Sequence, residues 1–232
     1  MLQPGISVVV PAFNEEDTIE EVVSQIFSVM ESLEVPFEVI VVDDGSTDRT
    51  RERATKLGAT VLSNGQNRGK GYALRKGFEK AQGEIIVTID SDGSHDPKEI
   101  LDLIKPVLNG EDVVAGSRFM GNGTHFTSRI NRIGSFMMNM AIAILTGKRI
   151  TDSQTGFRAF KSDFLKQVNL ESSGFEIESE ITVKALSNGF KFKEVPITCQ
   201  PRMYNLSRVK ILKDGIKIFH TILKANSAKI TH

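Results

Sequence analysis

The first half of the chain alternates short apolar runs with longer amphipathic stretches, and this alternation constrains the fold more than any other feature. The short runs are rich in Val and Ile and predict strands, whereas apolar residues at helical spacing predict helices between them. Such alternation favours an α/β fold, with a mainly parallel sheet covered by helices on both faces. The predicted strands are residues 6–10, 37–42, 60–62, 84–89 and 113–115, and the predicted helices are residues 15–33, 48–57, 71–81 and 97–108.

The second half of the chain, from about Arg118, is less regular. Its expected elements are a glycine-rich loop at 121–123, a helix at 129–145, a turn at 152–156, a helix at 178–188, a strand at 192–197 and a terminal helix at 207–225. A chain of 232 residues suits one domain with a substantial core.

The composition excludes several classes of protein. The 29 basic and 29 acidic residues balance, whereas a general nucleic-acid binder normally has a basic surplus, so we expect no nucleic-acid partner. The single cysteine, Cys199, excludes an internal disulfide and a thiolate-rich metal site. The first apolar run follows the N-terminus without a charged leader and cleavage site, so no signal peptide is expected. No apolar run reaches the roughly 18 to 20 residues of a transmembrane helix, so none is expected.

Polar or turn-forming residues follow every predicted strand. Ligands of open α/β sheets bind beyond the carboxyl ends of the strands, so we expect these residues to converge on one edge of the sheet. They are Pro11 to Glu15, Asp43 to Ser46, Ser63 and Asn64, Asp90 to Asp92, and Gly116 to Arg118.

Asp90 and Asp92 form the most informative of these groups. Side chains alternate along an extended segment, so both carboxylates point to the same side and repel one another unless a cation joins them. Mg²⁺ or Mn²⁺, held by two carboxylates and substrate phosphates, resolves that repulsion. The alternative, an acidic turn without a metal, is common for such a short motif. The strand before it and the other acids on the same edge favour the metal.

Two further loops have weaker individual signals. The segment Asp43 to Ser46 suits hydrogen bonds to a nucleobase or ribose, although it equally suits a turn that caps the next helix. Residues 67–71 form a glycine-rich basic loop that enters a helix, which is typical of anion binding. This loop lacks the complete pattern of a P-loop or a dinucleotide fingerprint.

Together these motifs resemble glycosyltransferase family 2, and in particular the dolichol-phosphate mannose synthase branch of polyprenyl-phosphate glycosyltransferases. The matching segments are residues 10–15, 42–48, 67–71, 90–97, 116–119, 152–158, and 201–208. They cover most of the chain in the family's order. The resemblance implies a GT-A fold in one catalytic domain, with a nucleotide-sugar-binding half at 1–117, an acceptor-side half at 118–206 and a terminal amphipathic helix at 207–232.

The resemblance also implies roles for individual residues. Catalytic roles are implied for Asp90, Asp92, Arg118 and Asp152, with Mg²⁺ or Mn²⁺ held by Asp90 and Asp92. Phosphate of the donor or of a lipid would be bound by Arg118, Arg129, Arg132, Arg202 and Arg208. Nucleotide-sugar binding is implied for Pro11, Ala12, Asn14, Glu15, Asp43, Asp44, Ser46, Lys70, Asp90, Ser91 and Asp92.

One position departs from the family's pattern. Close relatives of the mannose synthases often have a glutamine ligand two residues after the second aspartate, where this chain has Ser94. A hydroxyl is a poorer ligand than an amide oxygen, so the third protein ligand and the choice of mannose stay open.

The resemblance implies inverting transfer of a hexose from a nucleotide-sugar to a polyprenyl phosphate. GDP-mannose is favoured, and UDP-glucose and UDP-N-acetylglucosamine stay open. A phosphate acceptor is already a nucleophilic oxyanion, whereas a sugar hydroxyl would require a carboxylate base such as Asp152, Glu176 or Glu178. Glu176 and Glu178 alternatively cap and solvate the following helix. The other hypotheses are transfer to a soluble or polysaccharide acceptor and nucleotide-sugar binding without catalysis.

The terminal helix suggests a membrane surface as a further partner. Leu212, Ile216, Phe219 and Leu223 recur at helical spacing, with lysines on the opposite side. This pattern is typical of an interfacial helix, and equally of a helix that packs on its own domain. A lipid acceptor favours the membrane, as does the apolar stretch 136–142. The expected location is therefore the cytoplasm, peripheral on the cytoplasmic face of the membrane.

Overall fold

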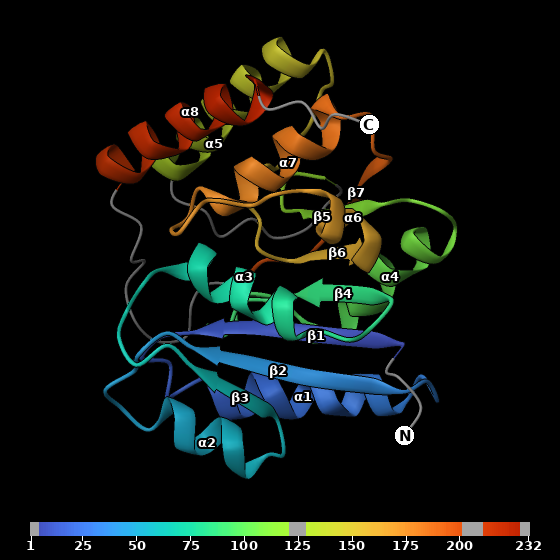
Figure 1. The fold of residues 1–232 in the computed structure, drawn as a ribbon, viewed down its shortest axis with the longest axis vertical. Coiled ribbons are helices and arrows are strands. Elements are labelled where there is room, and N and C mark those ends of the chain that lie inside the picture. Colours follow the sequence, from blue (N-terminus) through green and yellow to red (C-terminus); the bar gives the residue numbers. More distant parts are fainter. Residues whose placement is uncertain (1–4, 121–128, 201–210, 228–232) are drawn as a thin grey trace.

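The computed structural model describes residues 5–120, 129–200 and 211–227. Within these ranges, a seven-stranded sheet has the order β3-β2-β1-β4-β6-β5-β7 (Figure 1). Its strands pair in parallel except for β6, which runs antiparallel to β4 and β5. The strands are β1 (Ile6–Ala12), β2 (Phe37–Asp43), β3 (Thr60–Ser63), β4 (Ile85–Thr88), β5 (Val113–Ser117), β6 (Arg158–Lys161) and β7 (Phe192–Pro196).

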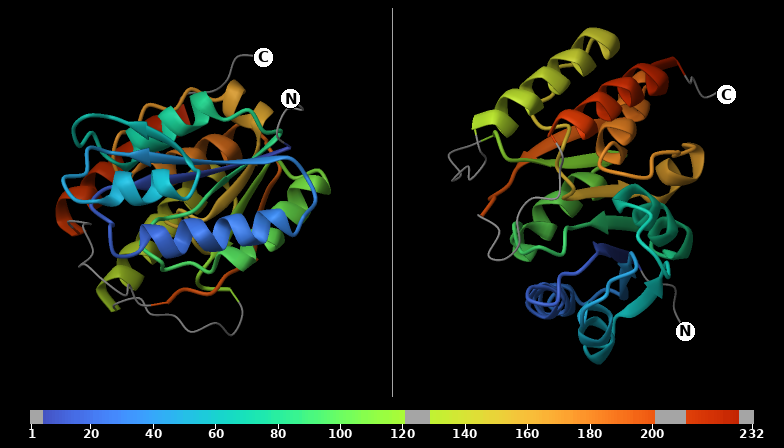
Figure 2. Two further views of the ribbon diagram at one scale, coloured as in Figure 1. Left: turned by 90° about the horizontal axis from the view of Figure 1, so that it is seen from below. Right: turned by 90° about the vertical axis from the view of Figure 1, so that its left-hand side faces the viewer.

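Helices cover both faces of the sheet, as Figure 2 shows. The helices are α1 (Ile19–Glu31), α2 (Thr50–Lys56), α3 (Lys70–Lys80), α4 (Ile100–Leu108), α5 (Arg129–Thr146), α6 (Ser162–Gln167), α7 (Ile177–Ser187) and α8 (Ile211–Ser227), with a short 3₁₀ helix, η1 (Pro97–Glu99).

Alternate residues of β1 contact opposite layers: Val8 and Val10 pack in the core with α1 and α4, whereas Val9 packs with α3, α6 and α7. This alternation is the period of two expected of a strand that is buried on both faces.

The predicted α/β fold and its mainly parallel sheet are confirmed, with two differences. The first helix begins at Ile19 because the preceding residues form a loop that is tied to other segments. In that loop, Glu15 N donates to Thr50 Oγ1 at 2.8 Å and Thr18 Oγ1 donates to the backbone oxygen of Ser91 at 2.7 Å. Because these contacts join residues far apart in the sequence, the spacing of apolar residues could not predict where the helix begins.

The second difference is that β6 and α6 were not predicted. β6 has only four residues and a basic residue at each end, so it lacks the apolar signature of a central strand. Arg158 is nevertheless fully buried, and its guanidinium donates to the backbone oxygens of Thr155 and Ser153 at 2.8 Å and to Thr182 Oγ1 at 2.9 Å. These acceptors make burial of the charge possible.

A third apolar cluster joins α5, α7 and α8 at the end of the molecule away from β3 (Figures 1 and 2). It contains Ile142, Val183, Ile218, Ile222 and Ala225. No helix in the described ranges is long and apolar enough to cross a membrane.

Candidate active site

A cavity of about 460 Å³ opens at the carboxyl ends of β1, β2 and β4. Its volume is within the range of small-molecule sites. The predicted convergence is thus observed for the ends of β1, β2 and β4, whereas the residues predicted after the third and fifth strands do not line this cavity. Phe175, for which no role was predicted, joins the cavity wall. The lining residues are Pro11, Ala12, Phe13, Glu15, Asp44, Asn67, Gly69, Lys70, Ala73, Asp90, Ser91, Asp92 and Phe175.

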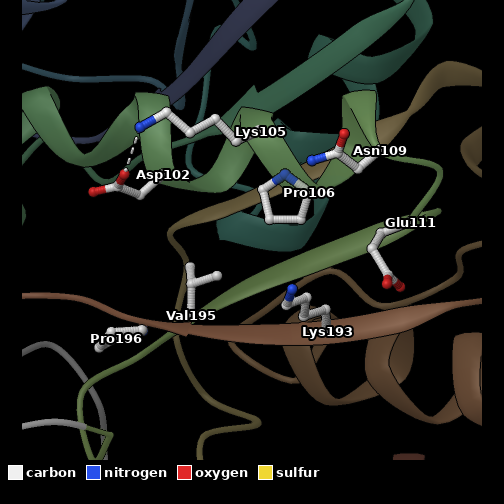
Figure 3. A pocket seen from close by; sticks show the side chains of 8 residues that line it. All are labelled: Asp102, Lys105, Pro106, Asn109, Glu111, Lys193, Val195 and Pro196. Atoms are coloured by element: carbon white, nitrogen blue, oxygen red, sulfur yellow. Dashed lines mark hydrogen bonds and ion pairs between the residues drawn. The ribbon is translucent and has the colours of Figure 1, made fainter.

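A second cavity, of about 430 Å³, lies between α4 and the edge strand β7 (Figure 3). Figure 3 shows that acidic and basic side chains are spread around this cavity and do not point towards a common centre. None of the predicted site residues lines it, so the first cavity is the candidate active site. The lining residues of the second are Asp102, Lys105, Pro106, Asn109, Glu111, Lys193, Val195 and Pro196.

Asn14, Asp43 and Ser46 join the loops after β1 and β2 and do not line the cavity. The backbone N–H of Asn14 donates to Ser46 Oγ at 2.9 Å, and Thr47 N donates back to Asn14 Oδ1 at 2.7 Å. Ser46 N donates to Asp43 Oδ1 at 3.0 Å. These three residues thus fix the shape of the cavity wall.

Asp44 anchors the glycine-rich loop before α3. Its carboxylate accepts from Asn64 Nδ2 at 2.7 Å and from the backbone N–H groups of Arg68 and Gly69 at 3.0 and 2.7 Å. Gly69 has φ +98°, and a Cβ there would lie 2.3 Å from the backbone oxygen of Ser173. Only glycine fits this turn, which brings the N-terminus of α3 to the cavity.

Lys70, the first residue of α3, makes ion pairs with two carboxylates. Its Nζ lies 2.6 Å from Asp90 Oδ1 and 2.7 Å from Glu178 Oε1. Burial by itself lowers the pKa of Lys70, because it disfavours the charged ammonium. The negative charges of Asp90 and Glu178 have the larger combined effect and hold this pKa above its usual value. Burial raises the pKa of Glu178, while Lys70 opposes that effect.

The two glutamates named as alternative bases differ in their surroundings. Glu176 accepts from Ser173 N at 3.3 Å and Gly174 N at 3.0 Å, and so holds the loop before α7. Glu178 is 3% exposed and pairs with Lys70. The interpretation of Glu178 as a solvated helix residue is therefore wrong, because tertiary packing buries this turn.

The segment of Asp90 and Asp92 is fixed by its neighbours. Ser91 Oγ donates to the backbone oxygen of Pro11 at 2.9 Å, and Ser94 N donates to Asp92 Oδ1 at 3.0 Å. The described residues contain no group of three side chains of the metal-ligating types that could hold a metal ion. Two carboxylates at the mouth of a cavity nevertheless match a Mg²⁺ or Mn²⁺ site that substrate phosphates complete.

His95 lies buried behind these aspartates. Its ring stands 5.3 Å from that of Phe157, and its Nδ1 has no hydrogen-bond partner in the described ranges. Burial lowers the pKa of His95, and the negative charges of Asp90 and Asp92 oppose that effect. The ring is therefore neutral at physiological pH.

Replacing His95 by glutamine is expected to reduce the sensitivity of the protein to acid. The native state resists protonation of His95, whereas the unfolded chain takes up a proton below the ordinary pKa of 6.5. The stability due to the neutral ring is thus present above pH 6.5 and falls by up to about 1.4 kcal/mol per pH unit below it. Urea unfolding at about pH 7.5 and 5.5 measures this loss.

The matched control is His220→Gln, since His220 is exposed on α8. This variant should retain the acid sensitivity of the unmodified chain. An equal loss of stability on acidification in the chain and in His95→Gln would contradict the assignment to His95.

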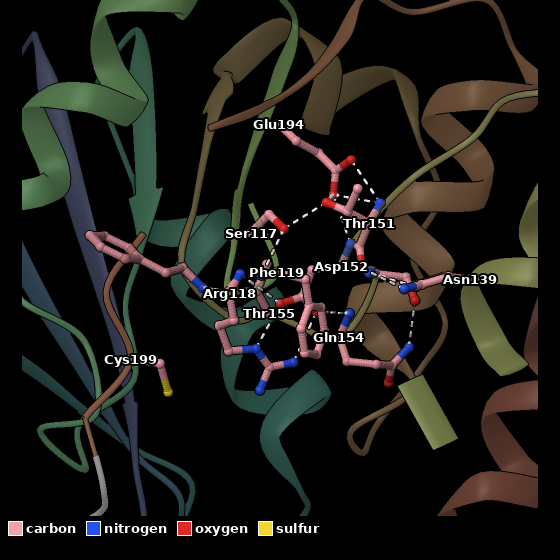
Figure 4. Close-up of polar contacts among 12 residues, drawn as sticks. Ser117, Arg118, Phe119, Asn139, Thr151, Asp152, Gln154, Thr155, Glu194 and Cys199 are labelled. Carbon is pink, nitrogen blue, oxygen red and sulfur yellow. Dashed lines mark hydrogen bonds and ion pairs between the residues drawn. The ribbon is translucent and has the colours of Figure 1, made fainter. Parts of the chain in front are cut away.

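Arg118 and Asp152 form a bidentate pair beside the same edge of the sheet (Figure 4). Arg118 Nε donates to Asp152 Oδ2 at 2.6 Å and its Nη2 donates to Oδ1 at 2.9 Å. Burial disfavours the guanidinium, yet Asp152 raises the pKa of Arg118 above its usual value. Asp152 N donates to Glu194 Oε1 at 2.7 Å, so the pair is anchored to β7. Asp152 thus orients Arg118.

The structure describes only some of the other arginines that were predicted to bind phosphate. Arg132 is exposed on α5. Arg129 begins α5, but its side chain lies outside the described part, as do Arg202 and Arg208 entirely. The glycine-rich loop at 121–123 also lies outside it.

Comparisons with known proteins identify the family of this chain. The family model for "Glycosyl transferase family 2" matches residues 7–168. The chain belongs to glycosyl transferase family 2. The resemblance in the sequence is thereby confirmed, and the chain is a glycosyltransferase.

Two relatives of this family 2 chain act on dolichyl phosphate according to their names. It is 33% identical to a dolichol-phosphate mannosyltransferase of Pyrococcus furiosus, over 88% of this chain and 59% of the relative. It is 30% identical to a UDP-N-acetylglucosamine–dolichyl-phosphate N-acetylglucosaminyltransferase of Methanococcus voltae, over 97% of both chains. The family 2 chain thus spans about three fifths of the first relative and almost all of the second.

The fold of the family 2 chain matches a solved enzyme. Glucosyl-3-phosphoglycerate synthase of Mycobacterium tuberculosis, in complex with Mn²⁺, uridine diphosphate and phosphoglyceric acid, superposes with a TM-score of 0.78 at 25% identity. The match covers 96% of this chain and 78% of that enzyme. The expected GT-A fold is confirmed.

Proposed function

We propose that the chain transfers a hexose, with inversion, from a nucleotide-sugar to a polyprenyl phosphate. The observation that carries this proposal is the acidic pair Asp90 and Asp92 in the wall of a cavity that is large enough for a small-molecule ligand. Arg118, held in a fixed orientation by Asp152, supports it. The names of the two relatives support the lipid acceptor. GDP-mannose is the favoured donor, and UDP-glucose and UDP-N-acetylglucosamine are the alternatives.

The donor would lie in the cavity with its nucleoside against Pro11, Ala12 and Glu15. A bound Mg²⁺ or Mn²⁺, held by Asp90 and Asp92, would neutralise negative charge on the departing diphosphate. Lys70 lines the same cavity and supplies a fixed positive charge. Because this charge is already in place, little reorganisation is needed as the transfer proceeds.

Arg118 would hold the acceptor phosphate. Asp152 occupies the Nε and Nη2 groups of its guanidinium, which leaves Nη1 outside that bidentate pair. A phosphate oxygen is itself the nucleophile, so the chain needs to align it with the sugar carbon and needs no strong base. The bidentate contact of Asp152 with Arg118 agrees with this positioning role.

A lipid acceptor also requires an apolar surface, and α5 and α8 offer one. Although these helices pack together around Ile142 and Ile218, each keeps large apolar side chains exposed. Soluble monomers rarely expose large apolar patches, which supports contact with a membrane surface. The exposed residues are Ile133, Phe136, Met137, Met140 and Ile144 on α5, and Ile216, Phe219 and Leu223 on α8.

The double variant Phe136→Glu and Met140→Glu is expected to weaken binding to vesicles of phosphatidylcholine and phosphatidylglycerol by about tenfold or more. Both changes put a charge where an apolar side chain would enter the lipid. Co-sedimentation with vesicles measures the effect. Leu108→Glu is the matched control, because Leu108 on α4 is 71% exposed and Phe136 is 66% exposed. Unchanged binding, or an equal loss in the control, would argue against this surface.

The reaction is tested by incubating the protein with Mn²⁺, dolichyl phosphate and each labelled nucleotide-sugar in turn. Labelled lipid, identified by mass, is the expected product and also names the donor. Transfer to phosphoglyceric acid or another soluble acceptor, with no labelled lipid from any donor, would refute the lipid acceptor. Donor binding without any transfer would refute catalysis.

A further inference from the structure

Lys70 lies between two carboxylates that come from opposite halves of the chain. Asp90 follows β4 in the first half, whereas Glu178 is in the first turn of α7 in the second half. The side chains of Lys70, Asp90 and Glu178 are 14%, 22% and 4% exposed. The proposed function uses Lys70 and Asp90 but gives Glu178 no role.

The surrounding backbone keeps the ammonium between these carboxylates. A Cβ at Gly156 would lie 2.5 Å from Lys70 Nζ and 2.8 Å from both carboxylate oxygens of Asp90. A Cβ at Gly71 would lie 2.6 Å from the backbone oxygen of Ser172. The cluster is thus enclosed by the loops before β6 and α7. Asp90 and Glu178 flank the ammonium as ion-pair partners, and Lys70 still lines the cavity.

Among the described residues, acidic side chains outnumber basic ones in the cavity wall. Glu15, Asp44, Asp90 and Asp92 line it, with Lys70 as the basic residue of that lining. Glu178 adds a carboxylate behind Lys70, with the buried Arg158 near Glu178, and Arg118 is paired with Asp152. A nucleoside diphosphate is itself strongly anionic. Its entry alone is therefore opposed by like charges at close range in a partly buried site.

We infer, on the basis of the proposed function, that Glu178 is a positioning residue that makes donor binding depend on a divalent cation. Glu178 draws the Lys70 ammonium towards α7 and adds a negative charge behind it. The nucleoside diphosphate then gains less from Lys70, and Asp90 retains more of its attraction for a metal ion. A divalent cation and a nucleoside diphosphate consequently favour each other's binding, and this coupling is reciprocal.

The test is Glu178→Gln, which keeps the size of the side chain and a hydrogen-bond acceptor but removes the charge. Isothermal titration with UDP and GDP, in chelator and then in saturating Mn²⁺, measures the coupling. Without metal, the variant should bind whichever nucleotide the unmodified chain prefers about tenfold more tightly. Mn²⁺ alone, followed by electron paramagnetic resonance, should bind less tightly. The enhancement of nucleotide binding by Mn²⁺ should shrink by a similar factor.

Glu180→Gln is the matched control. Glu180 lies on the same helix, is 3% exposed like Glu178, and pairs with Lys184 at 2.7 Å away from the cavity. The Glu180→Gln variant should lower the stability of the protein without changing how strongly Mn²⁺ enhances nucleotide binding. Lys70→Gln provides a second test, since it should weaken nucleotide binding without metal and strengthen binding of Mn²⁺ alone.

The outcomes separate this inference from the proposed function. If the unmodified chain binds neither UDP nor GDP with Mn²⁺, the proposed function fails. If it binds one of them and Glu178→Gln leaves the coupling unchanged, only the inference is overturned. The same coupling change in Glu180→Gln would also overturn it, because the effect would then belong to α7 as a whole.

Discussion

Replacing Asp92 by asparagine is expected to lower the rate of sugar transfer by about 100-fold or more. The amide keeps the shape of the side chain and an oxygen that accepts from Ser94 N, as Asp92 Oδ1 does at 3.0 Å. It lacks the negative charge that holds a divalent cation beside the donor diphosphate. Transfer measured over a range of Mn²⁺ concentrations should show a weaker response to the metal as well as a lower rate.

Asp96→Asn is the control for this variant. The carboxylate of Asp96 accepts from Lys98 N at 2.9 Å at the start of η1, and asparagine caps a helix equally well. Its transfer rate should stay close to that of the unmodified chain. Retained Mn²⁺-dependent transfer in Asp92→Asn would exclude Asp92 from the metal site.

Replacing Asp152 by asparagine is expected to destabilise the protein by about 3 kcal/mol. Its carboxylate is buried and accepts two N–H groups of Arg118, whereas an amide accepts only one of them. The guanidinium then loses its fixed orientation, so transfer should also fall by about 10- to 100-fold at temperatures where the variant is folded. Urea unfolding and the acceptor dependence of the rate measure the two effects.

Asp112→Asn is the matched control for Asp152→Asn. Asp112 also pairs with a basic side chain, Lys161, at 3.0 Å, but its side chain is 24% exposed and it lies outside the candidate site. Its loss should cost about 1 kcal/mol or less and leave transfer unchanged. A stable and fully active Asp152→Asn would show that Arg118 needs no partner to act.

Local patterns in the sequence predicted most of the sheet and the position of the site. The strands from Ile6 to Ser117 and the helices between them follow from apolar periodicity, because that signal is complete within each element. The acids at the strand ends predicted one functional edge, because parallel strands bring their carboxyl ends together. Pro11, Asp90 and Asp92 line the cavity as expected.

The structure shows how some of the predicted residues are held in their loops. Asn14, Asp43 and Ser46 stand at the expected strand ends, where Ser46 Oγ accepts from Asn14 N and Asp43 Oδ1 accepts from Ser46 N. Their part in nucleotide-sugar binding stays a prediction. The sequence distinguishes polar residues from apolar ones. It does not tell which polar side chain turns towards the cavity and which one supports the wall behind it, because that depends on loop conformation.

The terminal helix packs on its own domain, as one of the two alternatives predicted, and it also keeps apolar side chains exposed; its contact with a membrane stays a proposal. Ile218 and Ile222 pack on α5 and α7, while Ile216 and Phe219 stay exposed. The spacing of apolar residues in the terminal helix predicted one broad apolar face. Which part of that face is buried depends on where α5 and α7 pack against it.

The sequence by itself determined the alternation of strands and helices, the acidic strand ends and the family, because each depends on residues close together in the chain. Only the tertiary structure decided that β6 lies between β4 and β5, and that Lys70 pairs with Glu178. These pairings join segments far apart in the chain. Their energies depend on burial and on the positions of distant atoms, which no local pattern records.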